Sequence, residues 1–363
     1  MKMSRRRSPL ARPLRVAMVA AALALAACGS ANHTPVPTLK TSGPVSTPAP
    51  GQLKPVLHGL LDRTGEPPAQ FLSSLAGYVV NAHWSDLQPA QGGPIAANNV
   101  IDQSIAAVRA INASAHLHLG LKVRLYAGIW APDWAKNLGG GPVQVADPSS
   151  GQGGTVGRFW TDAFGEAYAD LQNKLAAKYD SVPEVREVTI SRCMTVFAEP
   201  LIRDISNPSA VQALLSAGYS VTADEQCQQQ QITAHRVWQH TRSDLSFNPY
   251  QVINSDGSTS TDEAFTESLM DYCRHELGRA CVLENNSLRQ GNPPNYQAMY
   301  AHMQSLGPPI AIQTAASKKV TDLISTIQTA AGIGASSVEL PSDYQAQAPT
   351  TLSGVAQSLA SSP

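Results

Sequence analysis

After residue 27 the sequence contains no long apolar run, so the remaining chain is not predicted to cross a membrane. It carries no excess of charge, because 26 Lys and Arg oppose 27 Asp and Glu, and no basic patch indicates a nucleic-acid partner. No CxxC pair or His/Cys cluster with zinc spacing predicts a metal site. No GxGxxG or P-loop follows the first predicted strand, so neither a nucleotide-binding fold nor a cofactor is expected.

The N-terminus combines a basic segment with an apolar one. Lys and Arg cluster in residues 2–15, and an apolar run follows over 16–27, which is the layout of a secretory signal. Residues 25–29 (LAACG) resemble the bacterial lipobox, in which small residues precede an acylated cysteine. The resemblance implies a signal peptide over 1–27 and lipid on Cys28, which anchors the protein to the cell membrane outside the cytoplasm. An ordinary signal peptide and an uncleaved anchor are the alternatives.

Residues 28–54 are dominated by Ser, Thr, Pro, Ala and Gly. Such a segment cannot bury enough apolar surface to offset its ordering entropy, and its prolines keep it extended. It is predicted to be a disordered linker between the membrane and a folded domain over 55–350. A domain of about 300 residues is long for one ordinary core but usual for a single (β/α)8 barrel.

The folded part alternates short apolar runs with longer segments of helical periodicity. The runs predict strands at residues 56–61, 78–83, 122–129, 185–195, 245–252, 281–286, 310–314 and 337–340, the last followed only by a short tail. Ile101, Ile105 and Val108 recur at helical spacing between two of these runs. Continuous apolar strands alternating with helices are typical of a parallel sheet covered by helices. The predicted fold class is therefore α/β, a single (β/α)8 TIM barrel after the signal peptide and linker.

Four cysteines remain besides Cys28. Outside the cytoplasm an even number indicates disulfides. Closeness in sequence favours the pairs Cys193–Cys227 and Cys273–Cys281, although spacing alone does not fix the pairing.

Polar and aromatic residues close the predicted strands, where a (β/α)8 barrel has its active site. Trp offers a flat face to sugar rings, amides and Arg bind hydroxyls, and carboxylates perform acid–base chemistry. The strand ends thus predict a carbohydrate site. Its predicted substrate-binding residues are His83, Trp84, Asp86, Arg124, Trp130, Asn248, Glu284, Asn285 and Gln313.

Three segments at or near these strand ends are residues 83–89 (HWSDLQP), 120–124 (GLKVR) and 131–134 (APDW). Together they resemble the large retaining clan of (β/α)8 glycoside hydrolases that includes cellulases and β-galactosidases. Residues 198–200 (AEP) resemble the clan's Asn-Glu-Pro, and the resemblance implies that Glu199 is the general acid/base. Two positions depart from the clan: Ala198 replaces the Asn, and Gln313 stands where the nucleophile Glu belongs. An amide cannot form the usual glycosyl–enzyme ester.

Glycosidases need two carboxyl groups flanking the bond, so Glu199 requires a partner. Glu339 is preferred to Glu284, because it ends a buried-looking strand where a carboxylate is expensive unless paired or functional. The fourth and eighth strands face each other across a barrel, which favours the long carboxyl separation of inverting enzymes, about 6.5–9.5 Å.

Three functions follow from these observations. The leading hypothesis is a tethered glycoside hydrolase with Glu199 and Glu339 as its catalytic pair and a carbohydrate as its substrate. The second is a sugar-binding barrel that has lost its nucleophile, motivated by Gln313 and Ala198. The third is the solute-binding lipoprotein of an importer, which the strand spacing of one uninterrupted barrel disfavours. No sequence feature indicates an oligomeric state.

Overall fold

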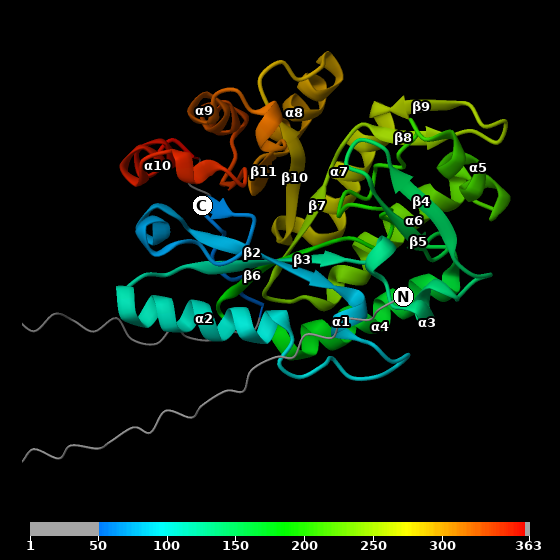
Figure 1. Ribbon diagram of the computed structural model, residues 1–363, viewed down its shortest axis with the longest axis horizontal. Coiled ribbons are helices and arrows are strands. Elements are labelled where there is room, and N and C mark those ends of the chain that lie inside the picture. The colour runs from blue at the N-terminus through cyan, green and yellow to red at the C-terminus, as the bar shows by residue number, and fades with distance from the viewer. Residues whose placement is uncertain (1–50, 360–363) are drawn as a thin grey trace, which may run out of the picture. The chain divides into compact units, whose positions relative to one another are not determined.

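Residues 51–359 are described by the computed structural model of the chain (Figure 1). The predicted signal peptide, Cys28 and nearly all of the predicted linker lie outside these residues. Within 51–359, no helix combines the length and the apolar character that crossing a membrane requires.

Eight parallel strands close into a barrel in the order β1-β12-β11-β10-β7-β6-β3-β2. They are β1 (Gly59–Asp62), β2 (Gly77–His83), β3 (Gly120–Tyr126), β6 (Val185–Thr189), β7 (Arg242–Ser246), β10 (Cys281–Leu288), β11 (Ile310–Thr314) and β12 (Ser337–Leu340). In chain order each barrel strand pairs with the next, and β12 closes the ring on β1. The predicted single (β/α)8 barrel is confirmed.

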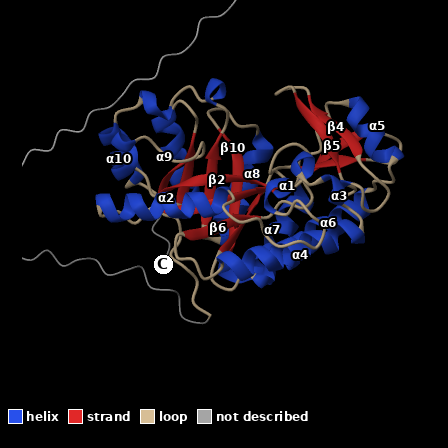
Figure 2. Cartoon of the chain, turned by 60° about the horizontal axis from the view of Figure 1, so that its bottom comes forward, coloured by secondary structure: helices blue, strands red, loops and turns tan. Residues whose placement is uncertain are grey.

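Helices cover the outside of the barrel (Figure 2). The α-helices of residues 51–359 are α1 (Trp84–Leu87), α2 (Val100–Ala115), α3 (Asp133–Lys136), α4 (Asp162–Tyr179), α5 (Pro208–Ser216), α6 (Val221–Ala234), α7 (Glu263–Leu277), α8 (Pro294–Leu306), α9 (Leu323–Ile333) and α10 (Pro349–Ala356). Helix α2 shows how the local sequence sets the start and the buried face of such a helix. The side chain of Asn99 accepts hydrogen bonds from the first turn, and Ile101, Ile105 and Val108 are buried as their spacing predicts.

The first crossover differs from this scheme. Between β1 and β2 the chain forms a 3-10 helix, Ala69–Ser74, and α10 packs against it. The Ser74 hydroxyl donates to the Pro349 carbonyl over 2.9 Å. The prediction that only a short tail follows the last strand is therefore wrong, because α10 covers the side of the barrel where the first crossover lacks an α-helix.

Three strand predictions are too long, and the excess residues form the mouth of the barrel. Strand β3 ends at Tyr126 and β6 at Thr189, and irregular chain or short helical turns follow. The run 245–252 is divided between β7 and β8 (Tyr250–Ile253), since Pro249 between them has no N–H to donate to a sheet. Strand β8 pairs with β9 (Thr259–Asp262) in a hairpin outside the barrel, and a second hairpin joins β4 (Val143–Asp147) to β5 (Gln152–Val156).

The folded domain begins earlier than residue 55. Lys54 is 1% exposed, and its ammonium group donates to the Val185 carbonyl and the Thr241 hydroxyl, both at 2.7 Å. Burial lowers the pKa of this lysine to about 8. The end of the predicted linker is thus part of the barrel's packing.

Two disulfides link elements of the fold. Cys193, after β6, is bonded to Cys227 on α6, and Cys273 on α7 is bonded to Cys281 at the start of β10. All four sulfur-bearing side chains are buried. The first bridge lies on the chain segment that carries Glu199, and the second lies away from it.

Candidate active site

Alternating residues of the barrel strands point inward and build a charged interior. On β3 these are Lys122 and Arg124, and on β12 the corresponding residue is Glu339. The ammonium nitrogen of Lys122 lies 2.8 Å from Asp244 Oδ2 and 2.8 Å from Glu339 Oε1, and it also contacts Glu284. Branched apolar side chains usually fill this space in such barrels. Here three carboxylates converge on one buried ammonium group.

The carboxyl groups of this cluster have different proton affinities. Burial alone would raise the pKa of Glu339, but the charges of Arg124 and Lys122 outweigh it and lower the pKa to about 2. Burial raises the pKa of Glu284 well above its usual value, and the neighbouring charges of Asp244 and Glu339 add to the effect. Glu339 is therefore ionised at any working pH, with Lys122 and Arg124 on its two oxygens.

Glu199 lies on the irregular segment between β6 and α5. Its side chain is partly exposed, and Asn248 donates a hydrogen bond to Glu199 Oε2 over 3.0 Å. Desolvation raises the pKa of Glu199 to about 7, although the Asn248 hydrogen bond and the charge of Arg124 oppose the rise. Arg124 thus acts electrostatically on both Glu199 and Glu339.

A chain of hydrogen bonds orients the amide that holds Glu199. The Tyr300 hydroxyl donates to Asn285 Oδ1 over 2.8 Å, and Asn285 Nδ2 donates to Asn248 Oδ1 over 3.2 Å. Because Asn248 Oδ1 accepts here, its Nδ2 is directed toward Glu199. Two predicted substrate-binding residues, Asn248 and Asn285, are buried and act in the structure as supports of Glu199.

An aromatic stack forms part of the rim of the mouth. The rings of His83 and Trp130 are parallel within 5° and 4.1 Å apart, and Asp86 lies 3.5 Å from the His83 ring. Trp130 is 38% exposed and lines a pocket of about 500 Å³ together with Asp133 and Lys136. This arrangement presents an apolar ring with polar groups nearby, which suits a sugar ring.

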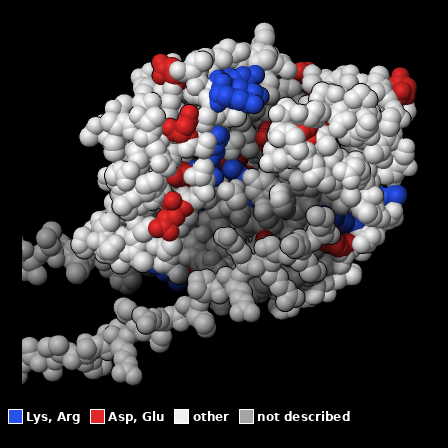
Figure 3. All heavy atoms as spheres, in the orientation of Figure 1, with Lys and Arg blue, Asp and Glu red and all other residues white. Residues whose placement is uncertain are grey.

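The Trp130 loop and the Glu199 segment lie against each other. The Ile129 N–H donates to the Thr195 carbonyl over 3.0 Å. A side chain at Gly128, whose φ is +30°, would bring its Cβ to 2.0 Å from the same carbonyl, so glycine is required for this approach. The face toward the viewer in Figure 3 is hollowed between the elements around α8 and the two hairpins, and charged side chains gather there.

Two further predicted substrate-binding residues, Trp84 and Glu284, are buried in the interior. Trp84 is 0% exposed, surrounded edge-on by Trp134, Phe164 and Tyr168, and its indole N–H donates to Gln88. No ring face of Trp84 is left for a sugar. Glu284 is 1% exposed and contacts Lys122 inside the barrel, below the mouth. Gln313 is partly exposed, and Cα pairing places it beside Glu339 on the adjacent strand.

The sequence reasoning missed Lys122 and Asp244 as site residues. Lys122 and Arg124 stand two apart inside a predicted strand, and Arg242, Asp244 and Ser246 stand two apart in β7, most of which precedes the predicted run 245–252. Charged residues with the period of a strand, within or next to a run predicted to be buried, were the available signal. Among residues 51–359 no three His, Cys, Asp or Glu side chains are arranged to hold a metal ion.

The fold defines the chain as a (β/α)8 barrel. No family model matches it, and no curated protein matches it. Among solved structures it is similar to the catalytic domain of β-amylase from Paenibacillus polymyxa, at 10% identity and a TM-score of 0.47, over 78% of this chain and 91% of that one.

Endo-glycoceramidase II from Rhodococcus sp. is similar at 12% identity and a TM-score of 0.46, over 85% and 81% of the two chains. Morphinone reductase is similar at 13% identity and a TM-score of 0.44, over 85% and 92%. Several of the similar structures are glycoside hydrolases, but a reductase shares the same likeness. The comparisons therefore concern the barrel, and the chemistry has to be argued from the side chains.

Proposed function

We propose that this chain is a membrane-anchored, extracytoplasmic glycoside hydrolase that uses Glu199 as its general acid/base. The observation that carries the proposal is the contrast between two carboxyl groups of the barrel. Glu199 has a pKa of about 7, and Glu339 has a pKa of about 2. Glycoside hydrolysis needs one carboxyl that holds a proton near neutral pH and one that does not.

Glu199 is suited to the first role. It is partly exposed, so a glycosidic oxygen can reach it, and it retains its proton close to neutral pH. Glu199 donates that proton to the leaving oxygen as the glycosidic C–O bond breaks, while Asn248 holds the carboxyl in place. A water molecule adds to the anomeric carbon on the opposite side and gives its proton to the ionised second carboxylate.

Glu339 supplies the second, ionised carboxylate. The clan that the sequence resembles carries its nucleophile at the position of Gln313, and Glu339 is the pairing partner of Gln313 one strand further along. Adjacent strands lie about 4.8 Å apart. The carboxylate that the clan carries at the position of Gln313 is therefore replaced by one on the neighbouring strand, at Glu339. Strands β6 and β12 are on opposite sides of the ring, which favours the long carboxyl separation and an inverting reaction.

Trp130 and His83 form the proposed sugar platform, and Arg124 binds or orients polar groups between the two carboxyls. The substrate is an oligo- or polysaccharide outside the cell, within reach of an anchor on Cys28. Replacement of Cys28 by serine is expected to release the protein from the membrane fraction. Retention of Cys28→Ser in that fraction would contradict the lipid anchor.

A second function, sugar binding without hydrolysis, is favoured by one observation. Glu339 is 1% exposed and both of its oxygens are already paired, while the amide of Gln313 cannot replace it as a nucleophile. A barrel of this kind would bind saccharides through the Trp130 platform and release no product.

The discriminating experiment uses the purified chain on a panel of β-linked and α-linked glucans, xylans, galactans and mannans. Reducing ends are measured for wild type and for Glu199→Gln, and the product anomer is followed by NMR. Hydrolysis is expected to fall about 10²- to 10⁴-fold in the variant. Equal rates in both proteins would exclude Glu199, and calorimetric binding without reducing ends from wild type would establish the binding barrel.

A further inference from the structure

Glu199 depends on the rest of the molecule for its position, because its own segment contains no regular structure. Between the end of β6 at Thr189 and the start of α5 at Pro208, the described chain forms turns and bends. Backbone hydrogen bonds of a helix or sheet therefore do not hold this carboxyl. Its position has to come from contacts that the segment makes with neighbouring elements.

The first such contact lies on the N-terminal side of Glu199. Cys193 is bonded to Cys227 of α6. The Cys193 N–H also donates to the side-chain oxygen of Gln231 over 3.1 Å. Both partners are buried and both belong to α6, so this end of the segment is fixed to the helix by one covalent bond and one hydrogen bond.

The second contact lies on the C-terminal side. Arg203 donates through Nε and Nη2 to the two oxygens of Asp224, at 2.7 and 2.5 Å. Gln228 Nε2 donates to the Pro200 carbonyl over 2.7 Å, directly next to Glu199. Both Asp224 and Arg203 are 0% exposed, and such a two-pronged ion pair fixes orientation as well as distance.

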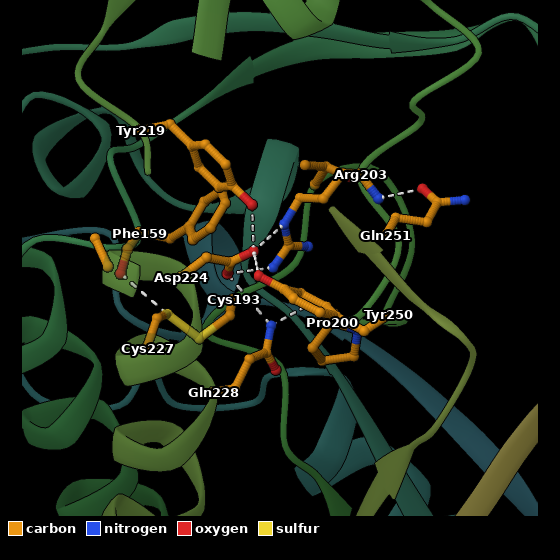
Figure 4. A network of polar contacts seen from close by, with 12 residues as sticks. Phe159, Cys193, Pro200, Arg203, Tyr219, Asp224, Cys227, Gln228, Tyr250 and Gln251 are labelled. Carbon is orange, nitrogen blue, oxygen red and sulfur yellow. Dashed lines mark hydrogen bonds and ion pairs between the residues drawn. A yellow bond between two sulfur atoms is a disulfide. The ribbon is translucent and has the colours of Figure 1, made fainter. Parts of the chain in front are cut away.

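Asp224 is the centre of this second contact (Figure 4). Besides Arg203, the hydroxyls of Tyr219 and Tyr250 donate to Asp224 Oδ2, at 2.6 and 2.9 Å. The disulfide lies beside this network in the same view. Asp224 is thus fully engaged, and its loss would leave a buried guanidinium and two hydroxyls without an acceptor.

Both contacts come from one face of one helix. Asp224, Cys227, Gln228 and Gln231 have the spacing i, i+3, i+4 and i+7, which places them on a single stripe of α6, and all four are buried. Such a stripe normally carries apolar residues that pack on the core. A buried polar stripe costs desolvation, which is offset by hydrogen bonds among these residues and by their bonds to the Glu199 segment.

We infer that this stripe of α6, consisting of Asp224, Cys227, Gln228 and Gln231, positions Glu199, with Asp224 and the Cys193–Cys227 bridge as its two main positioning elements. The inference rests on the proposed role of Glu199 and assigns to α6 the placement of the acid. A misplacement of about 1 Å can cost about 100-fold in rate, so small changes on this stripe should reach the chemistry.

The test compares Asp224→Asn and the double variant Cys193→Ser/Cys227→Ser with a matched control, Cys273→Ser/Cys281→Ser. The control removes the other disulfide, which joins α7 to β10. Two quantities are measured: kcat and KM on the hydrolysed glycan, and the pKa of Glu199 by NMR titration of carboxyl-labelled glutamate. Glu199→Gln assigns the signal.

Both stripe variants are expected to lower kcat about 10- to 100-fold with little change in KM, and to move the Glu199 pKa away from about 7. The control is expected to keep both values. The inference is overturned if the stripe variants titrate and turn over as wild type does, or if the control shifts Glu199 equally.

The test also covers two cases in which the measurements above fail. If Asp224→Asn does not fold, Gln228→Leu is measured in its place. It removes the hydrogen bond to Pro200, the weaker contact with Asp224 at 3.4 Å and the acceptor of Gln231 Nε2, and it leaves the Arg203–Asp224 ion pair in place. If wild type hydrolyses no glycan, the proposed function fails, whereas the NMR titration still shows whether the stripe places Glu199.

Discussion

Two sides of this barrel hold the same kind of side chain in opposite ways. Glu339 extends from strand β12, is 1% exposed, and has Lys122 and Arg124 on its oxygens. Glu199 stands on an irregular segment, is partly exposed, and is held by the amide of Asn248. The first arrangement stabilises the charged carboxylate. In the second, desolvation outweighs the single amide donor and favours the protonated acid.

The difference teaches that proton affinity here is set by the neighbours and not by depth alone. Glu339 is the more deeply buried of the two, yet its pKa is about 2 because two cations outweigh desolvation. Glu199 faces only one amide donor directly and keeps a pKa of about 7.

The largest effect is expected from Glu339→Gln. The change leaves Arg124 without its buried partner charge and removes one of the three carboxylates around Lys122. Loss of a buried partner charge typically costs about 3–5 kcal/mol of stability. The free energy of unfolding is measured in urea, with the exposed Glu66→Gln as control. As the pH falls from 4.5 toward 2, wild type is also expected to lose more stability than the variant, because only wild type has Glu339 to protonate. A loss no greater than that of Glu66→Gln would contradict the charged cluster.

The next effect concerns the pH dependence of hydrolysis. Because Glu199 acts as an acid with a pKa of about 7, kcat/KM is expected to fall about tenfold for each pH unit above 7. Glu339 stays ionised throughout and imposes no limit in this range. A rate that remains constant up to pH 9 would show that Glu199 is not the proton donor.

A smaller effect of opposite sign is expected for the stability of Glu199→Gln. Its raised pKa means that the unfolded chain ionises first as the pH rises from 4.5 toward 7, so the folded state loses stability over that range. The amide removes this penalty. At pH 8 the free energy of unfolding of the variant should exceed that of wild type by about 1–2 kcal/mol. At pH 4 the two free energies should be equal. Destabilisation at both pH values would contradict the raised pKa.

The smallest effect on stability is expected from Trp130→Ala. Since Trp130 is 38% exposed, the substitution should change the free energy of unfolding of the protein by less than about 1 kcal/mol. Oligosaccharide affinity should fall about fivefold or more, because the stacking platform beside His83 is lost. Titration calorimetry measures the affinity, and unchanged binding would remove Trp130 from the substrate surface.

Much of the barrel could be predicted from the sequence because its signals are local. Apolar runs and helical spacing such as that of Ile101, Ile105 and Val108 follow from side chains a few residues apart. Strand ends were less predictable, since the run 245–252 reads as continuous although Pro249 interrupts it. The beginning of the domain was misplaced because Lys54 is buried by contacts with residues more than a hundred positions away.

The features of the candidate site are likewise of two kinds, those that the sequence predicts and those that only the tertiary structure shows. The sequence by itself determined the barrel class. It singled out Glu339 at the end of a strand-forming run, and Glu199 through the resemblance of residues 198–200 to the Asn-Glu-Pro of the glycoside hydrolase clan. Only the tertiary structure decided that Trp84 is a core residue, that Lys122 joins three carboxylates, and that α6 holds the Glu199 segment. The physical reason is that a pKa and a position depend on partners brought together by barrel closure, and local spacing does not encode those partners.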